Sequence, residues 1–229
     1  MVQTDAYTMA EYDRSALITI DVQNATLDGG VLEIPGTTAM LPDIGRLCRS
    51  FRRAARPIVH MIRIYTPDAK DADRCRRTAL LAGHPLLLTG SQGRRPVDAL
   101  LPDPTLGIDD DRLLQGKFQT IGPNEAVLYK PRWGAFYRTP LKTHLKEKGV
   151  STLVIAGCNY PNCTRATIYE ASERDYRITA VIDAISGITP SDVDWLQAIG
   201  VNCLTTAQLV ALIDKGASEC LTQTGAEAP

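Results

Sequence analysis

Six short apolar segments, none longer than seven residues, recur along the 229-residue chain. Most are rich in β-branched side chains. Such segments are typical of strands buried on both faces of a parallel sheet, because a strand covered on both sides needs apolar residues at consecutive positions. The expected strands span residues 16–22, 57–63, 126–129, 152–156, 178–182 and 201–204.

Helical patterns lie between these segments. Ile44, Leu47 and Phe51 recur at helical spacing, and Ser191 with Asp194 resembles a capping box. Strands that alternate with helices form right-handed βαβ units. The sequence therefore predicts an α/β fold: a doubly wound, mostly parallel six-stranded sheet with helices on both faces, in three αβα layers.

The spacing of the strands also predicts the domain organisation. Residues 1–215 are expected to form a single domain, and residues 216–229 a frayed tail. The stretch 64–125 is too long for an ordinary crossover between strands and is rich in Pro, Gly, Asp and Arg. We expect it to be an excursion over the catalytic face.

Charge and cysteine usage exclude several classes of protein. Lys plus Arg number 25 and Asp plus Glu 26, so electrostatics gives no reason to expect nucleic acid or an anionic membrane as the main partner. No run of 18 apolar residues is present, and residues 1–14 lack the pattern of a signal peptide. Six irregularly spaced cysteines are typical of reduced thiols, which predicts a cytoplasmic protein.

Three reactive side chains stand at expected strand ends. Asp21 lies at the end of 16–22, Lys130 follows 126–129, and Cys163 opens a helical stretch after 152–156. Ligands of doubly wound sheets bind beyond the carboxyl ends of the strands. Alone, each residue has a structural alternative: a turn cap, a solvated loop charge or a small buried hydrophobe. Together they predict a site in which a helix N-terminus and Lys130 lower the thiol pKa and Asp21 takes the thiol proton.

The motifs around these residues resemble those of the isochorismatase-like cysteine hydrolases. Asp21-Val-Gln-Asn24 is similar to the family's D-x-Q-x opening, and Lys130 to its strand-end lysine. Gly157, six residues before Cys163, is similar to its nucleophile loop, and Asp183-Ala184 to its next strand end. The resemblance covers about residues 16–213. Nicotinamidases, N-carbamoylsarcosine amidases and streptothricin hydrolases belong to this family.

The resemblance implies a mechanism that uses a catalytic triad of Asp21, Lys130 and Cys163. The Cys163 thiolate would attack an amide carbonyl, and Asp21 would shuttle the proton to the leaving amine before water hydrolyses the thioester. The backbone N–H groups of Asn159 and Cys163 would hold the oxyanion. In relatives the peptide bond that corresponds to Cys158–Asn159 is cis.

Several departures from the family pattern limit which metal, cofactor and reaction we expect. Nicotinamidases place an Asp and two His after the second strand to hold a metal, whereas residues 62–68 contain no His and the histidines at 60, 84 and 144 are scattered. We therefore expect no metal and no cofactor. Isochorismatases that cleave vinyl ethers lack the nucleophilic cysteine, so Cys163 argues against that reaction. Tyr160 and Pro161 replace the family's usual Thr and acidic residue, and Thr26 stands where Phe is usual.

Aromatic and polar residues near the three strand ends are candidates for substrate contacts. Trp133 and Tyr137 follow Lys130 in one loop and would form a wall for a flat substrate. Core packing is the alternative for such aromatic residues. The further candidates with polar side chains are Asn24, Arg63 and Tyr160.

These observations predict an amidohydrolase that cleaves a C–N bond of a small molecule. The bond could belong to a linear amide, a ureido group or a lactam. The alternative is a non-catalytic relative that binds a small molecule or a protein. A dinucleotide-binding protein is disfavoured, because no G-x-G-x-x-G follows the first strand. Family members are usually oligomers, so the resemblance implies a homodimer or a larger homo-oligomer.

Overall fold

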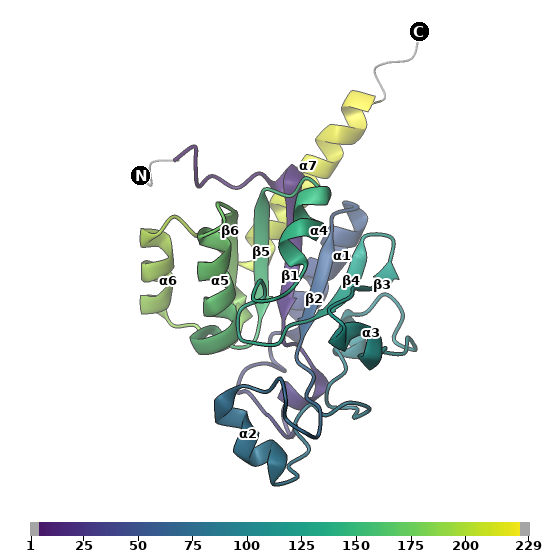
Figure 1. Ribbon diagram of the computed structural model, residues 1–229. Helices are drawn as coiled ribbons and strands as arrows, with labels where there is room; N and C mark the ends of the chain where they lie inside the picture. The colour runs from purple at the N-terminus through teal and green to yellow at the C-terminus, as the bar shows by residue number, and fades with distance from the viewer. Residues whose placement is uncertain (1–4, 225–229) are drawn as a thin grey trace.

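The structure, a computed structural model, describes residues 5–224, with side chains described up to residue 215. Its centre is a seven-stranded sheet in the order β3-β4-β2-β1-β5-β6-β7, in which β3 is antiparallel to β4 and the other pairs are parallel (Figure 1). The strands are β1 (Ser15–Ile20), β2 (Ile58–Ile62), β3 (Gln119–Gly122), β4 (Glu125–Tyr129), β5 (Thr152–Gly157), β6 (Arg177–Ile185) and β7 (Asn202–Leu204).

All six expected strands are present, and β3 joins them at one edge of the sheet. The four residues of β3 (Gln-Thr-Ile-Gly) are partly or fully exposed, so β3 lacks the continuous apolar run that marks a buried strand. This edge position is why the sequence pattern did not indicate it. The doubly wound α/β class is confirmed.

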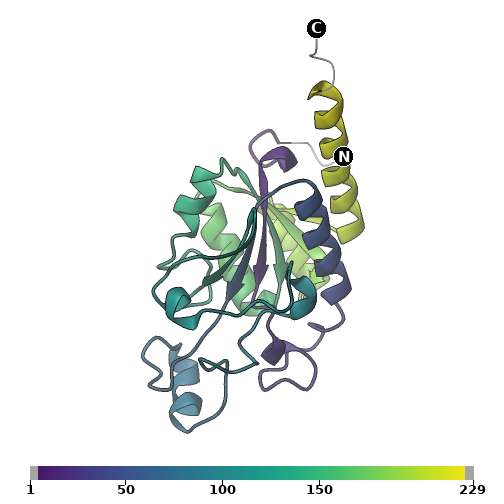
Figure 2. The same cartoon turned by 90° about the vertical axis from the view of Figure 1, so that its right-hand side faces the viewer.

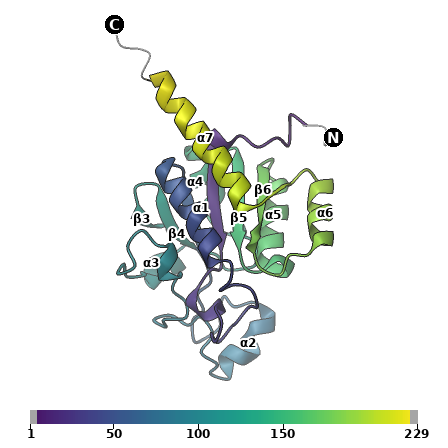
Figure 3. The same cartoon turned by 180° about the vertical axis from the view of Figure 1, so that it is seen from behind.

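Helices cover both faces of the sheet. One face carries α1 (Leu41–Arg53) and α7 (Thr206–Thr224), which contact each other (Figure 3). The other face carries α4 (Leu141–Glu147), α5 (Arg165–Ser172) and α6 (Pro190–Ala198). Figure 2 shows the sheet between these two layers. None of the described helices combines the length and hydrophobicity that crossing a bilayer requires.

The alternation of side chains along β1 divides the core in two. Ala16, Ile18 and Ile20 point into the cluster under α4, α5 and α6, whereas Leu17 points into the cluster under α1 and α7. All four side chains are fully buried. Because successive side chains of a strand point to opposite faces, a central strand covered on both sides needs this run of apolar residues.

Two expected features at the C-terminal side of the chain differ in detail. The capping box of α6 is formed by Thr189 and Asp192, not by Ser191 and Asp194, because the helix begins two residues earlier than the sequence pattern suggested. Helix α7 extends to Thr224 across part of the stretch 216–229, where a frayed tail was expected. Residues 225–229 lie outside the described residues.

The long stretch between β2 and β4 carries α2 (Arg74–Leu81), the short 3-10 helix η3 (Asp98–Leu100) and α3 (Asp110–Leu114). Helix α2 lies beyond the carboxyl ends of the central strands (Figure 1). Its Leu80 packs in a small separate cluster that includes Ala25, Tyr65 and Leu86. This stretch therefore forms one wall of whatever site occupies that end of the sheet.

Candidate active site

The strand order reverses at β1, which lies between β2 and β5. The registers of these strands bring their ends together: Ile20 of β1 is opposite both Met61 of β2 and Gly157 of β5. A Cβ atom on Gly157 would overlap the backbone of Ile20, so only glycine permits this close approach. The residues that follow these strands therefore share one confined space at the switch point.

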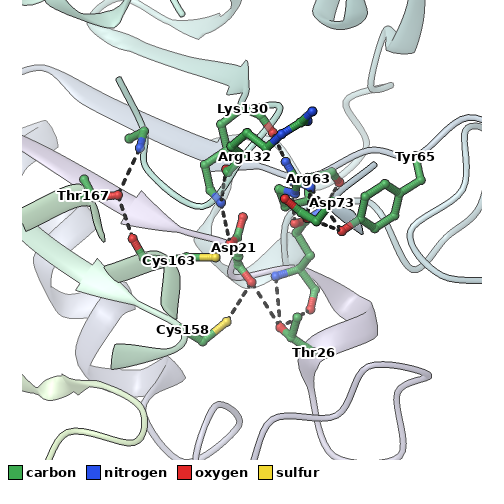
Figure 4. Close-up of polar contacts among 12 residues, drawn as sticks. Asp21, Thr26, Arg63, Tyr65, Asp73, Lys130, Arg132, Cys158, Cys163 and Thr167 are labelled. Atoms are coloured by element: carbon green, nitrogen blue, oxygen red, sulfur yellow. Dashed lines mark hydrogen bonds and ion pairs between the residues drawn. The ribbon is translucent and has the colours of Figure 1, made fainter. Parts of the chain in front are cut away.

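Asp21 and Lys130 form an ion pair in this space (Figure 4). Asp21 directly follows β1, and its φ of 51° is a left-handed conformation that is uncommon outside glycine and concentrates at functional sites. Lys130 directly follows β4, where its N–H donates to the carbonyl of Ile62. The Lys130 side chain has no exposed surface, so its ammonium is held inside the protein beside the carboxylate.

Cys163 lies within the short helical turn η4 (Tyr160–Thr164) that leads into α5. The pKa of its thiol is raised to about 12, mainly by burial and also by the neighbouring Asp21 carboxylate, while Lys130 and Arg63 act in the opposite direction. The prediction of a lowered thiol pKa is therefore wrong: Lys130 does act to lower the pKa, but the net shift is upward. Burial of the thiol therefore outweighs the effect of the two nearby cations.

The two carboxylate oxygens of Asp21 have different surroundings. Its Oδ2 is paired with Lys130, while its Oδ1 is buried and accepts no hydrogen bond from any described residue. A buried acceptor without a donor is uncommon in folded proteins and calls for an explanation.

A second thiol, Cys158, lies on the other side of Asp21 (Figure 4). Its Sγ donates to the Asp21 carbonyl oxygen at 2.9 Å, and burial strongly raises its pKa. Cys158 therefore supports the backbone of Asp21 and stays protonated. The Cys158–Asn159 peptide bond is cis, as the family resemblance implied.

The Gln of the D-x-Q motif joins three segments of the site. The fully buried Gln23 side chain donates to the carbonyls of Arg63 and Arg94 at 2.8 and 2.6 Å and accepts from the N–H of Arg63 at 2.9 Å. It therefore ties the segment after β1 to the end of β2 and to the long excursion. This supporting role was not part of the sequence prediction.

Arg63, an expected substrate contact, is largely engaged with the protein. Its guanidinium donates to the Lys130 carbonyl at 2.7 Å and to Tyr65 Oη at 3.1 Å, and it pairs with the Asp73 carboxylate (Figure 4). Tyr65 and Asp73 are site residues that sequence reasoning missed, and neither belongs to a recognisable motif. Through Asp73, which precedes α2, Arg63 fixes this helix to the end of the sheet.

These side chains enclose a cavity of about 120 Å³. Asp21, Cys163, Asn159, Arg63 and Trp133 line it, together with Arg76 of α2. The structure thus brings together the three expected catalytic residues and two of the five expected substrate contacts.

The other three expected substrate contacts lie elsewhere. Tyr137 lines a neighbouring hollow with Trp133. Tyr160 is buried in the core cluster under α5, and the Asn24 side chain donates to the Gln92 carbonyl instead of lining the cavity. A sequence pattern gives the position of a residue along the chain, but not the direction of its side chain.

No group of three or more His, Cys, Asp or Glu side chains within the described part of the chain could hold a metal ion. Two of the three histidines have structural contacts. His60 lies between Thr19 and Glu125, 2.8 Å from an oxygen of each, and the His144 ring packs on Phe118.

The fold and the site together define an α/β protein with an acid, a lysine and a thiol at its switch point, and comparison with known proteins assigns the family. The model of the isochorismatase domain matches residues 15–208. The chain therefore belongs to the isochorismatase family.

Curated relatives carry amidase names. A protein of Arabidopsis thaliana described as a probable inactive nicotinamidase is 29% identical over 188 residues, which cover 80% of this chain and 86% of the relative. A ureidoacrylate amidohydrolase of Methylobacterium radiotolerans is 28% identical, with 73% of this chain and 65% of the relative covered. An N-carbamoylsarcosine amidase of an Arthrobacter species is 26% identical, with 80% and 63% covered.

Solved structures share the fold. An isochorismatase family protein from Desulfovibrio vulgaris has a TM-score of 0.74 and 30% identity, and covers 88% of this chain and 98% of its own. An N-carbamoylsarcosine amidase from Thermoplasma acidophilum has a TM-score of 0.66 and 25% identity, with 84% and 96% covered.

Proposed function

We propose that this protein is a cysteine-dependent amidohydrolase that cleaves a C–N bond of a small molecule through a thioester. The observation that carries the proposal is the arrangement around Asp21: one carboxylate oxygen is paired with the buried Lys130, and the other is free beside the Cys163 thiol. A nucleophile next to a base that is oriented by a third group is the arrangement that covalent catalysis requires.

The proposed reaction begins with transfer of the thiol proton to Asp21 as Sγ bonds to the amide carbon. The N–H groups of Asn159 and Cys163 are the proposed donors to the oxyanion. Collapse of the intermediate breaks the C–N bond, and Asp21 returns the proton to the leaving amine. Asp21 then takes a proton from water as the water attacks the thioester. The product acid leaves, and Cys163 recovers its proton.

The size of the cavity limits the size of the chemical group that can react at Cys163. The cavity of about 120 Å³ is smaller than the roughly 300–1,000 Å³ of typical ligand pockets, so it accommodates only a compact group. A linear amide, a ureido group and a small lactam all meet this limit. The names of two relatives, a ureidoacrylate amidohydrolase and an N-carbamoylsarcosine amidase, support a carbamoyl-type head group.

A non-catalytic binding protein is the second candidate. The observation that favours it is that the relative from Arabidopsis thaliana is described as probably inactive for the reaction in its name. Asp21 and Cys163 line one cavity and Lys130 is paired with Asp21, an arrangement that supports the catalytic alternative.

Release of ammonia or amine from a panel of amides, ureas and lactams tests the proposal, with the Cys163→Ala variant as the blank. We expect Cys163-dependent release from at least one class, and trapping of a protein thioester by mass spectrometry after rapid acid quench. Release that persists in Cys163→Ala would contradict the proposal. So would the absence of release from every class by unmodified protein, when a separate sample shows that iodoacetamide alkylates Cys163.

We also propose that residues 1–215 act as one domain in a cytoplasmic homo-oligomer. Five described cysteines are free, which fits a reducing compartment. Tyr169 of α5 and Trp195 of the adjacent α6 are 46% and 70% exposed, and exposed aromatic side chains are typical of protein interfaces. Sedimentation of the purified protein tests the oligomeric state.

A further inference from the structure

A second hollow adjoins the catalytic cavity. It has a volume of about 590 Å³, and two of its lining residues, Asp73 and Trp133, also line the catalytic cavity. The remaining walls come from the start of α2, from the loop after β4 and from Glu170 of α5. The hollow is open to solvent, and because it shares Asp73 and Trp133 with the catalytic cavity, a molecule longer than the cavity can extend into it past Trp133.

The loop that carries the aromatic wall is firmly held. The N–H of Ala135 donates to Thr167 Oγ1 at 3.1 Å, and the N–H of Phe136 donates to Glu170 Oε2 at 2.8 Å. A Cβ atom on Gly134 would overlap the Glu170 carboxylate, so the loop and α5 are in close contact. Trp133 and Tyr137 on either side of these anchors are each 45% exposed toward the hollow.

Large aromatic side chains that remain half exposed on an anchored loop are suited to stack against a flat ligand. Such contacts strengthen binding about two- to tenfold beyond the effect of the buried area. Trp133 lines both the catalytic cavity and the hollow, whereas Tyr137 lines only the hollow. A flat ligand that extends from the cavity would therefore meet Trp133 first and Tyr137 next.

The charges of the hollow are unequal. The acidic residues are engaged, because Asp73 is paired with Arg63 and Glu170 accepts from a backbone N–H. Two arginines also line the hollow, and neither forms an ion pair with a residue that the structure describes. Arg132 donates to the backbone carbonyls of Asp71 and Pro131, whereas the Arg74 side chain has no hydrogen bond to a described residue. Arg74 is therefore a cationic side chain of the hollow that is available to an anionic group.

From this arrangement we infer that the substrate is elongated: an amide or ureido head reacts at Cys163, a flat apolar body lies against Trp133 and Tyr137, and a terminal carboxylate lies near Arg74. The inference rests on the proposed function, which it deepens by naming the substrate class. A short aliphatic amide would occupy the inner cavity only and leave the hollow unused.

Binding to the Cys163→Ala protein, measured by isothermal titration calorimetry, tests the inference without relying on turnover. The probes are methylurea, phenylurea and 4-ureidobenzoate, which share a ureido head and add first the ring and then the carboxylate. We expect phenylurea to bind about tenfold more tightly than methylurea. The carboxylate of 4-ureidobenzoate should add about threefold more, the range of a solvent-exposed ion pair.

Two variants in the same background assign these gains to their residues. Tyr137→Ala should weaken both aryl probes about fivefold. Arg74→Gln should weaken 4-ureidobenzoate about threefold and leave phenylurea unchanged. Tyr7→Ala and Arg49→Gln are matched controls, because both residues are exposed and neither lines the hollow. Both controls should leave all three dissociation constants unchanged.

Equal affinities for the three probes would overturn the inference, as would losses in the control variants equal to those in Tyr137→Ala and Arg74→Gln. The outcome is distinct from that of the proposed function. If the aryl probes bind as expected but no amide, urea or lactam is hydrolysed, the hollow is a binding site and the proposed hydrolase activity is rejected. If short amides are hydrolysed and the hollow contributes nothing to binding, the hydrolase activity is supported and the inference about the hollow is rejected.

Discussion

The Nζ of Lys130 lies 2.8 Å from Oδ2 of Asp21, and the two side chains are 0% and 7% exposed. Each charge is therefore compensated mainly by the other. The pair also fixes the orientation of the carboxylate, because Oδ2 faces the ammonium and Oδ1 is left without a donor among the described residues. The following predictions separate the contributions of this pair and of its surroundings.

Replacement of Lys130 by Met should destabilise the fold strongly. The variant leaves the buried Asp21 carboxylate without its partner, and breaking one side of a buried ion pair costs about 3–5 kcal/mol. Removing both charges in Asp21→Asn/Lys130→Met should recover most of the loss. Urea unfolding of the two variants gives the comparison, and equal stability of the single and double variants would show that the two charges do not depend on each other.

The same Lys130→Met variant should raise the pKa of the Cys163 thiol, because Lys130 is one of the groups that lower it. At a fixed alkaline pH below the thiol pKa, iodoacetamide should then react about tenfold more slowly. The rate of alkylation as a function of pH gives the measurement, and mass spectrometry confirms that Cys163 is the residue modified. A profile identical to that of the unaltered protein would remove Lys130 from the site.

Asp21→Asn should change alkylation and hydrolysis in opposite directions. The Asp21 carboxylate raises the pKa of Cys163, so its removal should lower that pKa and speed alkylation. Hydrolysis should fall by at least about a hundredfold, since general base catalysis contributes 10²–10⁴-fold. Parallel loss of both reactivities would indicate a collapsed site, whereas parallel retention would exclude Asp21 as the base.

Cys163→Ala should abolish hydrolysis with only a modest loss of stability, because the substitution removes a single sulfur atom and keeps Cβ. Cys163→Ser should lose several orders of magnitude, since a hydroxyl is a far weaker acid than a thiol and Asp21 cannot readily ionise it. Thermal unfolding serves as the control for an intact fold. Activity retained by either variant would be incompatible with a thioester.

Thr167 should act as a positioning residue for Cys163. Its hydroxyl donates to the Cys163 carbonyl at 2.8 Å and accepts from the N–H of Ala135 at 3.1 Å (Figure 4). Thr167→Val keeps the shape but removes both hydrogen bonds of the hydroxyl, which costs about 1–3 kcal/mol. We expect kcat to fall about tenfold with little change in KM, and Thr167→Ser to restore it. A change in stability without a change in kcat would limit Thr167 to a structural role.

Glu125 should make stability depend on pH in the acid range. Burial alone would raise its pKa, but hydrogen bonds from Arg52 and His60 outweigh burial, and the net pKa lies below the ordinary value of 4.5. A carboxyl group with a lowered pKa in the folded state stabilises the fold above its unfolded pKa and loses that contribution as pH falls through the folded value.

The Glu125→Gln variant tests this dependence. At pH 7 it should be about 2 kcal/mol less stable than the unaltered protein, the scale of hydrogen bonds to a buried charged group. The difference should shrink as the pH falls below 4.5. Arg53→Gln is the control: it removes the exposed ion pair with Asp214, and should cost less than about 1 kcal/mol. A difference for Glu125→Gln that is constant from pH 7 to pH 3 would contradict the prediction.

Sequence patterns alone determined the central layer of the fold and the three residues at its edge. Consecutive apolar residues indicate the buried strands, since both faces of such a strand are covered. Leu17 and Ile18 of β1, which point to opposite faces, are both fully buried. Because parallel strands place their carboxyl ends on one edge, the positions of Asp21, Lys130 and Cys163 along the chain already implied that they meet.

Tertiary structure alone decided how those residues behave and what surrounds them. The thiol pKa of Cys163 depends on burial, which outweighs the nearby Lys130 and which no local pattern reports. Tyr160 faces the core and Trp133 the cavity, although both follow strand ends. Asp73 reaches Arg63 from a long excursion without a motif. Periodicity records which face of an element is buried, whereas desolvation and side-chain direction depend on contacts between segments far apart in the chain.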